Sequence, residues 1–177
     1  MNLPPGVFQY LLIGQAFIPI LINFSVNIVL GWLTFSGKPT VSTWAFQNGA
    51  AADSISTCYF LPAITCLICT TIVRRHVKRG LVPLLPIQEA PHWVRWFRGH
   101  LLWRATKFGI VGLAVFSCPV YAAYCLSAGD TIATPLFLVI KVAFAVALGI
   151  IATPLIAMVA LTDEPEEQSL PRLDKSR

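Results

Sequence analysis

Four long apolar stretches constrain this chain more than any other feature of its sequence. They cover about residues 7–33, 54–73, 108–126 and 135–161. Each holds roughly the 20 apolar residues that a helix needs to cross about 30 Å of hydrocarbon. Because lipid offers no partners to backbone groups, each stretch should be helical. The sequence therefore predicts an all-α integral membrane protein, a four-transmembrane-helix bundle.

The composition supports this interpretation. Apolar residues make up 56 % of the 177 residues and charged residues 12 %, whereas soluble domains carry about 25 % charged residues. The first stretch follows no basic segment, has no small-residue cleavage pattern and exceeds the length of a signal-peptide core. We therefore expect it to be a retained helix rather than a cleaved signal.

The positive charges are concentrated in one loop, residues 74–107. It holds eight of the 13 Lys and Arg residues, all three histidines and a single acid, Glu89. The cations are Arg74, Arg75, Lys78, Arg79, Arg95, Arg98, Arg104 and Lys107. Such a block can indicate nucleic acid, but between two apolar spans the positive-inside rule accounts for it. We expect a cytoplasmic loop facing anionic lipid headgroups, without nucleic acid.

This orientation fixes the rest of the topology. With four spans, both termini lie in the cytoplasm, and loops 34–53 and 128–134 face outward. The tail, residues 162–177, is polar and mixed in charge, which predicts disorder. The small size and the lack of sorting signals indicate a bacterial inner membrane.

Residues 91–107 of the basic loop are predicted to form an interfacial amphipathic helix. At 100° per residue, Trp93, Phe97 and Leu101 share one side and Trp96 and Trp103 adjoin it, whereas Arg95 and Arg98 face away. Tryptophan at headgroup level with arginine above it is typical of a helix in the membrane plane. Leu102 and Arg104 fit this pattern poorly, so the alternative is an inward extension of the third span. This segment is the candidate lipid or partner interface.

Polar residues inside the spans form a candidate polar membrane face. Asn23 and Asn27 share one side of the first span, so they predict either a ligand pathway or an interhelical hydrogen-bond clamp. Lys141 is the only charge well inside a span and is a functional candidate. Alternatively it reaches outer headgroups, with Asp130 or Asp53 as its partner.

Each span also contains one proline, at positions 19, 62, 119 and 154. Each proline frees the carbonyl four residues earlier, belonging to Gln15, Cys58, Val115 and Ile150. Transporters expose such carbonyls to substrates. A structural kink is the alternative, because proline is common in membrane helices.

The five cysteines are Cys58, Cys66, Cys69, Cys118 and Cys125. The C-x-x-C at 66–69 lies inside a span, where packing explains it better than metal or redox chemistry. In size and predicted topology the chain resembles the quinone-coupled disulfide-forming enzymes of bacterial inner membranes. Their outer cysteine pairs are absent, although Cys58 and Cys125 both fall near the outer side.

No cofactor, metal site or catalytic set is predicted. No histidine inside a span can hold haem, and no phosphate loop or zinc motif occurs. We therefore expect a non-catalytic accessory or assembly subunit of a larger membrane complex, bound to a membrane protein or to further copies of itself. The alternative is a permease or channel component. A thiol oxidoreductase that uses Cys58 and Cys125 is third.

Overall fold

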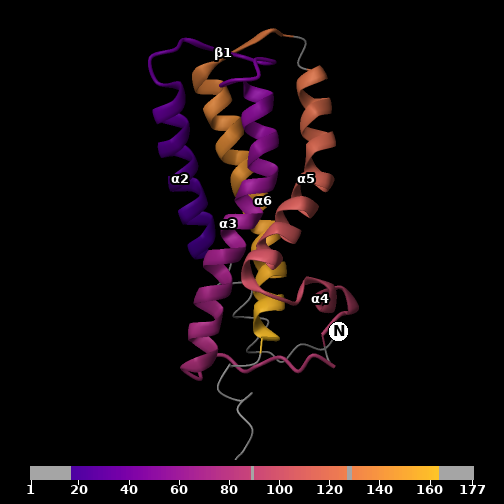
Figure 1. The fold of residues 1–177 in the computed structure, drawn as a ribbon. Helices are drawn as coiled ribbons and strands as arrows, with labels where there is room; N and C mark the ends of the chain where they lie inside the picture. The colour runs from indigo at the N-terminus through magenta and orange to yellow at the C-terminus, as the bar shows by residue number, and fades with distance from the viewer. Residues whose placement is uncertain (1–16, 89, 127–128, 164–177) are drawn as a thin grey trace, which may run out of the picture.

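The computed structural model describes residues 17–88, 90–126 and 129–163, with side chains from residue 21 onward. The elements in chain order are α2 (Phe17–Phe35), β1 (Thr40–Ser42), α3 (Ala50–Lys78), α4 (His92–Phe97), α5 (Leu101–Leu126), β2 (Thr131–Ala133) and α6 (Thr134–Leu161). The four long helices run alongside one another, with both strands at one end and α4 toward the other (Figure 1). We call these the strap end and the basic end.

Three helices in the described part of the chain are long enough and apolar enough to cross a membrane. They are α3 with 29 residues, α5 with 26 and α6 with 28. The apolar part of α2 that is described, Leu21–Phe35, is shorter. The start of the first predicted span, residues 7–16, lies outside the described residues. The prediction of a mostly helical protein with membrane-spanning helices is confirmed to that extent.

The helices do not pack in the order of the sequence. The main contacts join α5 to α3, α3 to α6, and α6 to α2. Helices that follow one another along the chain, α2 and α3 or α5 and α6, are not among these main pairs. The described helices thus form a row, α5–α3–α6–α2, and a closed four-helix bundle is not confirmed.

Glycines set the closest approach between helices. A Cβ on Gly112 of α5 would lie 2.4 Å from the carbonyl oxygen of Cys58 and 2.8 Å from the ring of Pro62, both on α3. On α6, a Cβ on Gly149 would lie 2.5 Å from the amide nitrogen of Asn23 on α2. Small residues at such points let two backbones approach, which is how membrane helices gain packing energy.

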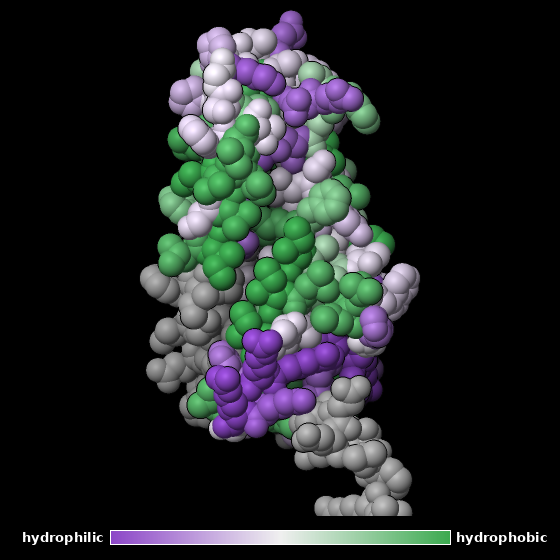
Figure 2. All heavy atoms as spheres, turned by 60° about the vertical axis from the view of Figure 1, so that its left-hand side comes forward, coloured by the Kyte–Doolittle hydropathy of each residue, from purple (hydrophilic) through white to green (hydrophobic). Residues whose placement is uncertain are grey.

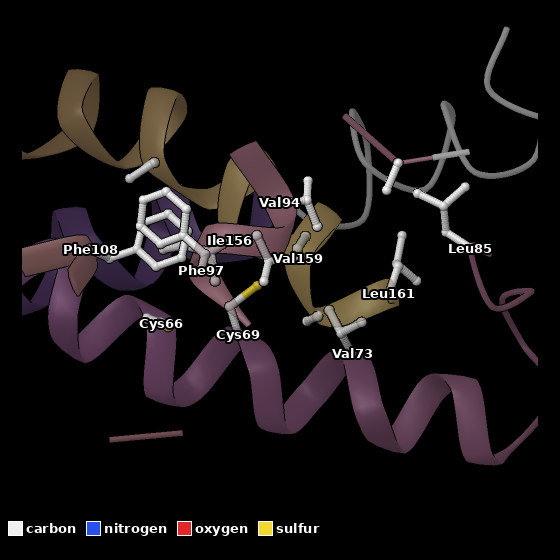
Figure 3. Packing of buried hydrophobic residues seen from close by; sticks show 14 of the residues in the cluster. Cys66, Cys69, Val73, Leu85, Val94, Phe97, Phe108, Ile156, Val159 and Leu161 are labelled. Carbon is white, nitrogen blue, oxygen red and sulfur yellow. The ribbon is translucent and has the colours of Figure 1, made fainter. Parts of the chain in front are cut away.

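The largest buried cluster lies at the basic end, where α3, α4, α5 and α6 meet (Figure 3). There the ring of Phe97 stacks on that of Phe108, with centroids 4.1 Å apart. The loop before α4 joins the cluster, because the Leu85 amide donates to the Leu161 carbonyl over 3.0 Å. The labelled members are Cys66, Cys69, Val73, Leu85, Val94, Phe97, Phe108, Ile156, Val159 and Leu161.

At the strap end, β1 and β2 pair antiparallel, with Val41 opposite Ile132. The Thr43 hydroxyl extends this pairing by donating to the Gly129 carbonyl over 2.7 Å. The Thr134 hydroxyl donates to the Lys38 carbonyl over 2.6 Å. We call this two-stranded element the strap; it joins loops 34–53 and 128–134, for which the sequence analysis predicted no strands.

The predicted interfacial helix over residues 91–107 is wrong in its extent. Only α4 is a separate helix, and residues 101–107 form the first turns of α5, as in the alternative. The break falls at Gly99, whose φ of +135° is a conformation that glycine adopts readily. Helix α5 starts beyond it, where the Arg104 amide donates to the His100 carbonyl.

Candidate functional site

The polar face predicted on the first span is the face that α2 turns toward α6. Asn27, Gly31 and Phe35 are buried at a spacing of four, whereas most other described residues of α2 are exposed. The Asn27 amide donates to the Asn23 carbonyl over 2.8 Å. The side-chain nitrogen of Asn23 lies buried beside Gly149 and has no hydrogen-bond partner among the described residues. One of the two amides is therefore satisfied within its own helix.

Lys141 of α6 pairs with Asp53 of α3. Its ammonium group lies 2.6 and 2.7 Å from the two carboxylate oxygens and 5.8 Å from the centre of the Phe35 ring. Asp53 stands in the first turn of α3, where the helix dipole favours an acid. Of the two partners that the sequence offered, the geometry selects Asp53, and the pair cross-links α3 and α6 near the strap.

A neighbouring hydrogen bond joins α3 to α5 at the same level. The hydroxyl groups of Ser54 and Tyr124 lie 2.8 Å apart in a buried position. Sequence reasoning missed this contact, because a serine and a tyrosine near span ends carry no distinctive signal. Together with Lys141 and Asp53, it fixes the central helix α3 to both of its neighbours.

The proline-freed carbonyls differ in their surroundings. The Cys58 carbonyl, freed by Pro62, is covered by the backbone of α5 at Gly112. Near Pro154, the Thr153 hydroxyl is fully buried, and the described part of the chain offers it no hydrogen-bond partner. Pro119 lies inside α5, and the side chain of Pro19 lies outside the described residues. At Pro62 at least, the carbonyl faces a neighbouring helix rather than an open path.

The cysteines are present as free thiols. Cys58, Cys66 and Cys69 are buried, and Cys118 and Cys125 are exposed. The C-x-x-C pair belongs to the hydrophobic cluster of Figure 3. Within the described residues, no three His, Cys, Asp or Glu side chains gather so that they could hold a metal ion.

The basic end contains a charged cluster that the sequence did not reveal. Arg104 of α5 is 1 % exposed and donates through both terminal nitrogens to Asp163, over 2.8 and 2.6 Å. Arg74 of α3 donates to the same carboxylate over 2.9 Å. Asp163 follows the end of α6, so three helices meet at one acid. The only sequence signal was the poor fit of Arg104 to the apolar side of an amphipathic helix.

Asp163 also changes the boundary of the predicted disordered tail. Thr162 is buried and its hydroxyl donates to the Val159 carbonyl, and Asp163 is held by two arginines. The first two residues of the segment 162–177 thus belong to the folded end of α6. The rest of that segment, from 164 onward, lies outside the described residues.

The predicted interface residues divide into a buried anchor and an exposed surface. Phe97 is 8 % exposed and stacks on Phe108, so its ring packs inside the molecule against α5. Trp93, Trp96 and Trp103 are 36 %, 56 % and 58 % exposed. Arg95 and Arg98 are exposed as well. We call these five exposed residues the tryptophan surface.

Contacts of Val94 and Lys107 fix the position of this surface. Val94 is fully buried beneath α4. The Lys107 ammonium donates to the Trp96 carbonyl and lies 5.0 and 5.7 Å from the ring centres of Trp96 and Trp103. A cation over an indole face is attracted by the ring quadrupole. The short helix α4 is thereby fastened to α5, and its exposed tryptophans have defined positions.

No family model matches the chain, and no curated protein or solved structure matches it either.

Proposed function

We propose that this chain is a non-catalytic accessory or assembly subunit of a larger membrane complex. In this proposal it spans a bacterial inner membrane four times, with the basic end and both termini in the cytoplasm. Its partner is another membrane protein or a further copy of the chain. The partner binds to the tryptophan surface.

The observation that carries the proposal is the anchored, exposed state of Trp93, Trp96 and Trp103. Binding hot spots are enriched in Trp and Arg. Affinity also rises when side chains are already fixed before binding, since less conformational entropy is lost. Here α4 is fastened by Val94 and Phe97 below and by Lys107 beside it.

Several polar groups within the helices support the same proposal. Lys141 and Asp53 neutralise each other, and Ser54 and Tyr124 bond to each other. A transport path would need such groups to face a solute. Their pairing across helix contacts favours a stable scaffold.

The test is the native mass of the protein after extraction from its own membrane in a mild detergent. We expect a larger stoichiometric species that is lost when Trp93, Trp96 and Trp103 are changed to Ala. The matched control changes Trp32, Trp44 and Phe46 to Ala, because these three aromatics are also exposed but lie near β1 in the chain, toward the strap. Retention of the partner by the first variant, or a wild-type monomer, contradicts the proposal.

One observation favours a permease as the second candidate. The Asn23 amide nitrogen and the Thr153 hydroxyl, on the packed helices α2 and α6, are buried and lack partners among the residues that the structure describes. An unpaired polar group in hydrocarbon costs several kcal/mol, and a solute could satisfy both. Flux of potassium, chloride or glycerol into reconstituted vesicles should then fall in Asn23→Leu and Thr153→Val variants that remain folded. Vesicles without flux of any of these probes argue against this candidate.

A further inference from the structure

The positive charges at the basic end are not equivalent. Two of them, Arg74 and Arg104, are bound by the carboxylate of Asp163. A third, Lys107, is engaged by the carbonyl and ring of Trp96. These three cations hold the fold together and have local partners.

The end of α3 carries three further cations, Arg75 and Lys78 in the helix and Arg79 as its C-cap. All three are exposed, and within the described residues none of them makes an ion pair. Their spacing of three and four places them on one side of the helix. The negative end of the helix dipole favours cations there, but like charges at this spacing repel one another. In the described part of the chain this cluster has no counter-charge, and a bound anion would relieve the repulsion.

The same side of α3 continues toward the middle of the molecule as a line of exposed apolar residues. Going back from Arg75, the line passes Thr71, Ile68, Ile64 and Phe60. Ile68 is 45 % exposed, Ile64 53 % and Phe60 58 %. Figure 2 shows the arrangement on this face of the molecule, with an apolar surface directly above a hydrophilic band at the basic end.

The part of this line between Arg75 and Ile64 has about the length of one leaflet of a bilayer. Eleven residues separate Ile64 from Arg75, which is about 16 Å along a helix and about half of a 30 Å hydrocarbon core. The ligand that combines an anion with an apolar chain of that length is a phospholipid. Basic residues next to a membrane helix attract anionic headgroups.

We propose that the end of α3 is a binding site for one anionic phospholipid. Arg75, Lys78 and Arg79 hold its phosphate, and an acyl chain lies along Ile68 and Ile64. The site is separate from the tryptophan surface and does not depend on a protein partner. The sequence indicates only that the whole basic loop attracts anionic lipid, whereas this proposal assigns the binding to three cations on one face of α3.

The experiment uses the purified chain in bilayer discs, with phosphatidylglycerol and phosphatidylcholine of equal chain length as probes. Native mass spectrometry counts the lipid that each variant retains. We expect the wild type to retain phosphatidylglycerol preferentially. Each Lys or Arg near a membrane surface contributes about 1 kcal/mol, so Arg75→Gln with Arg79→Gln should weaken retention roughly thirtyfold.

The matched control removes two charges from α4, by Arg95→Gln with Arg98→Gln, and should keep the preference. An equal loss in both double variants would show diffuse attraction and overturn the site. Absence of any wild-type preference for phosphatidylglycerol would also overturn it. Soluble glycerol phosphate is the last probe. If it displaces the lipid at equal concentration, the apolar residues along α3 contribute nothing to binding and the proposal fails. Circular dichroism verifies that each variant is folded.

Discussion

At the strap end, Lys141 meets one carboxylate, that of Asp53, whereas at the basic end Arg74 and Arg104 share the carboxylate of Asp163. Both clusters join helices far apart in the sequence. They differ in the charge that remains after pairing: positive and negative charges balance at the strap end, whereas the basic end keeps unpaired positive charges on α3 and α4. Charge inside this protein thus cross-links helices at both ends, but only one end has charge to offer to a partner.

The largest effect is expected from Asp163→Ala. It leaves the guanidinium of Arg104, 1 % exposed, without its counter-charge. Removing one partner of a buried pair costs about 3–5 kcal/mol, and the free energy of unfolding in detergent, followed by tryptophan fluorescence, measures it. Arg104→Met with Asp163→Leu should recover most of the loss. A cost below about 1 kcal/mol for Asp163→Ala would mean that the basic end is not cross-linked in this way.

The corresponding test at the strap end is Lys141→Met. Asp53 is partly exposed, with 22 % of its side chain accessible, so the expected cost is smaller, about 2–3 kcal/mol. Lys141→Met with Asp53→Leu should restore stability, because two apolar side chains need no counter-charge. If the double variant is as unstable as the single one, the lysine does more than neutralise Asp53. The same unfolding measurement, performed as a double-mutant cycle, decides this.

The third prediction compares the two sides of the helix row. Gly112→Ala places a methyl group against the backbone carbonyl of Cys58, and α5 must move, at about 1–3 kcal/mol. Gly149→Ala meets the end of the Asn23 side chain, which can rotate, so a cost below about 1 kcal/mol is expected. Thermal unfolding of both variants checks the order. The reverse order would show that the α2–α6 contact is the tighter one.

The smallest effect is expected from Arg74→Gln. Its side chain is 44 % exposed, and pairs that are this open contribute at most about 1 kcal/mol. The measurement is the midpoint of unfolding at low and high salt, where the wild type should approach the variant as salt rises. A loss as large as that of Asp163→Ala would assign the clamp to Arg74 instead of Arg104.

The helical class could be predicted because lengths of apolar sequence are read directly from the chain. Lys141 stood out because a charge inside a span is rare. Arg104 gives a weaker signal, because it fits the apolar side of the expected helix 91–107 poorly but an arginine near a membrane surface is common. The true start of α5 depends on the break at Gly99, and a glycine in a loop can serve many purposes.

The helix order and the strap could not be predicted for a related reason. Helices that are apolar on most sides have no clear buried face, so periodicity does not indicate which neighbour each one contacts. Consecutive spans usually pack together, which holds here for α3 and α5 but not for α2 with α3 or α5 with α6. Strands of three residues, such as Thr40–Ser42, give too short a pattern for detection. Asp163 was predicted to belong to the disordered tail, because the residues that follow it are polar and mixed in charge.

The strap has a consequence for how the chain is assembled in a membrane. The α2–α3 loop supplies β1 and the α5–α6 loop supplies β2, and the two pair residue by residue, from Thr40 with Ala133 to Ser42 with Thr131. Those bonds can form only when both loops have reached the same side of the bilayer. A molecule with one helical hairpin inserted upside down would leave both strands unpaired, as open edges that a quality-control protease could recognise.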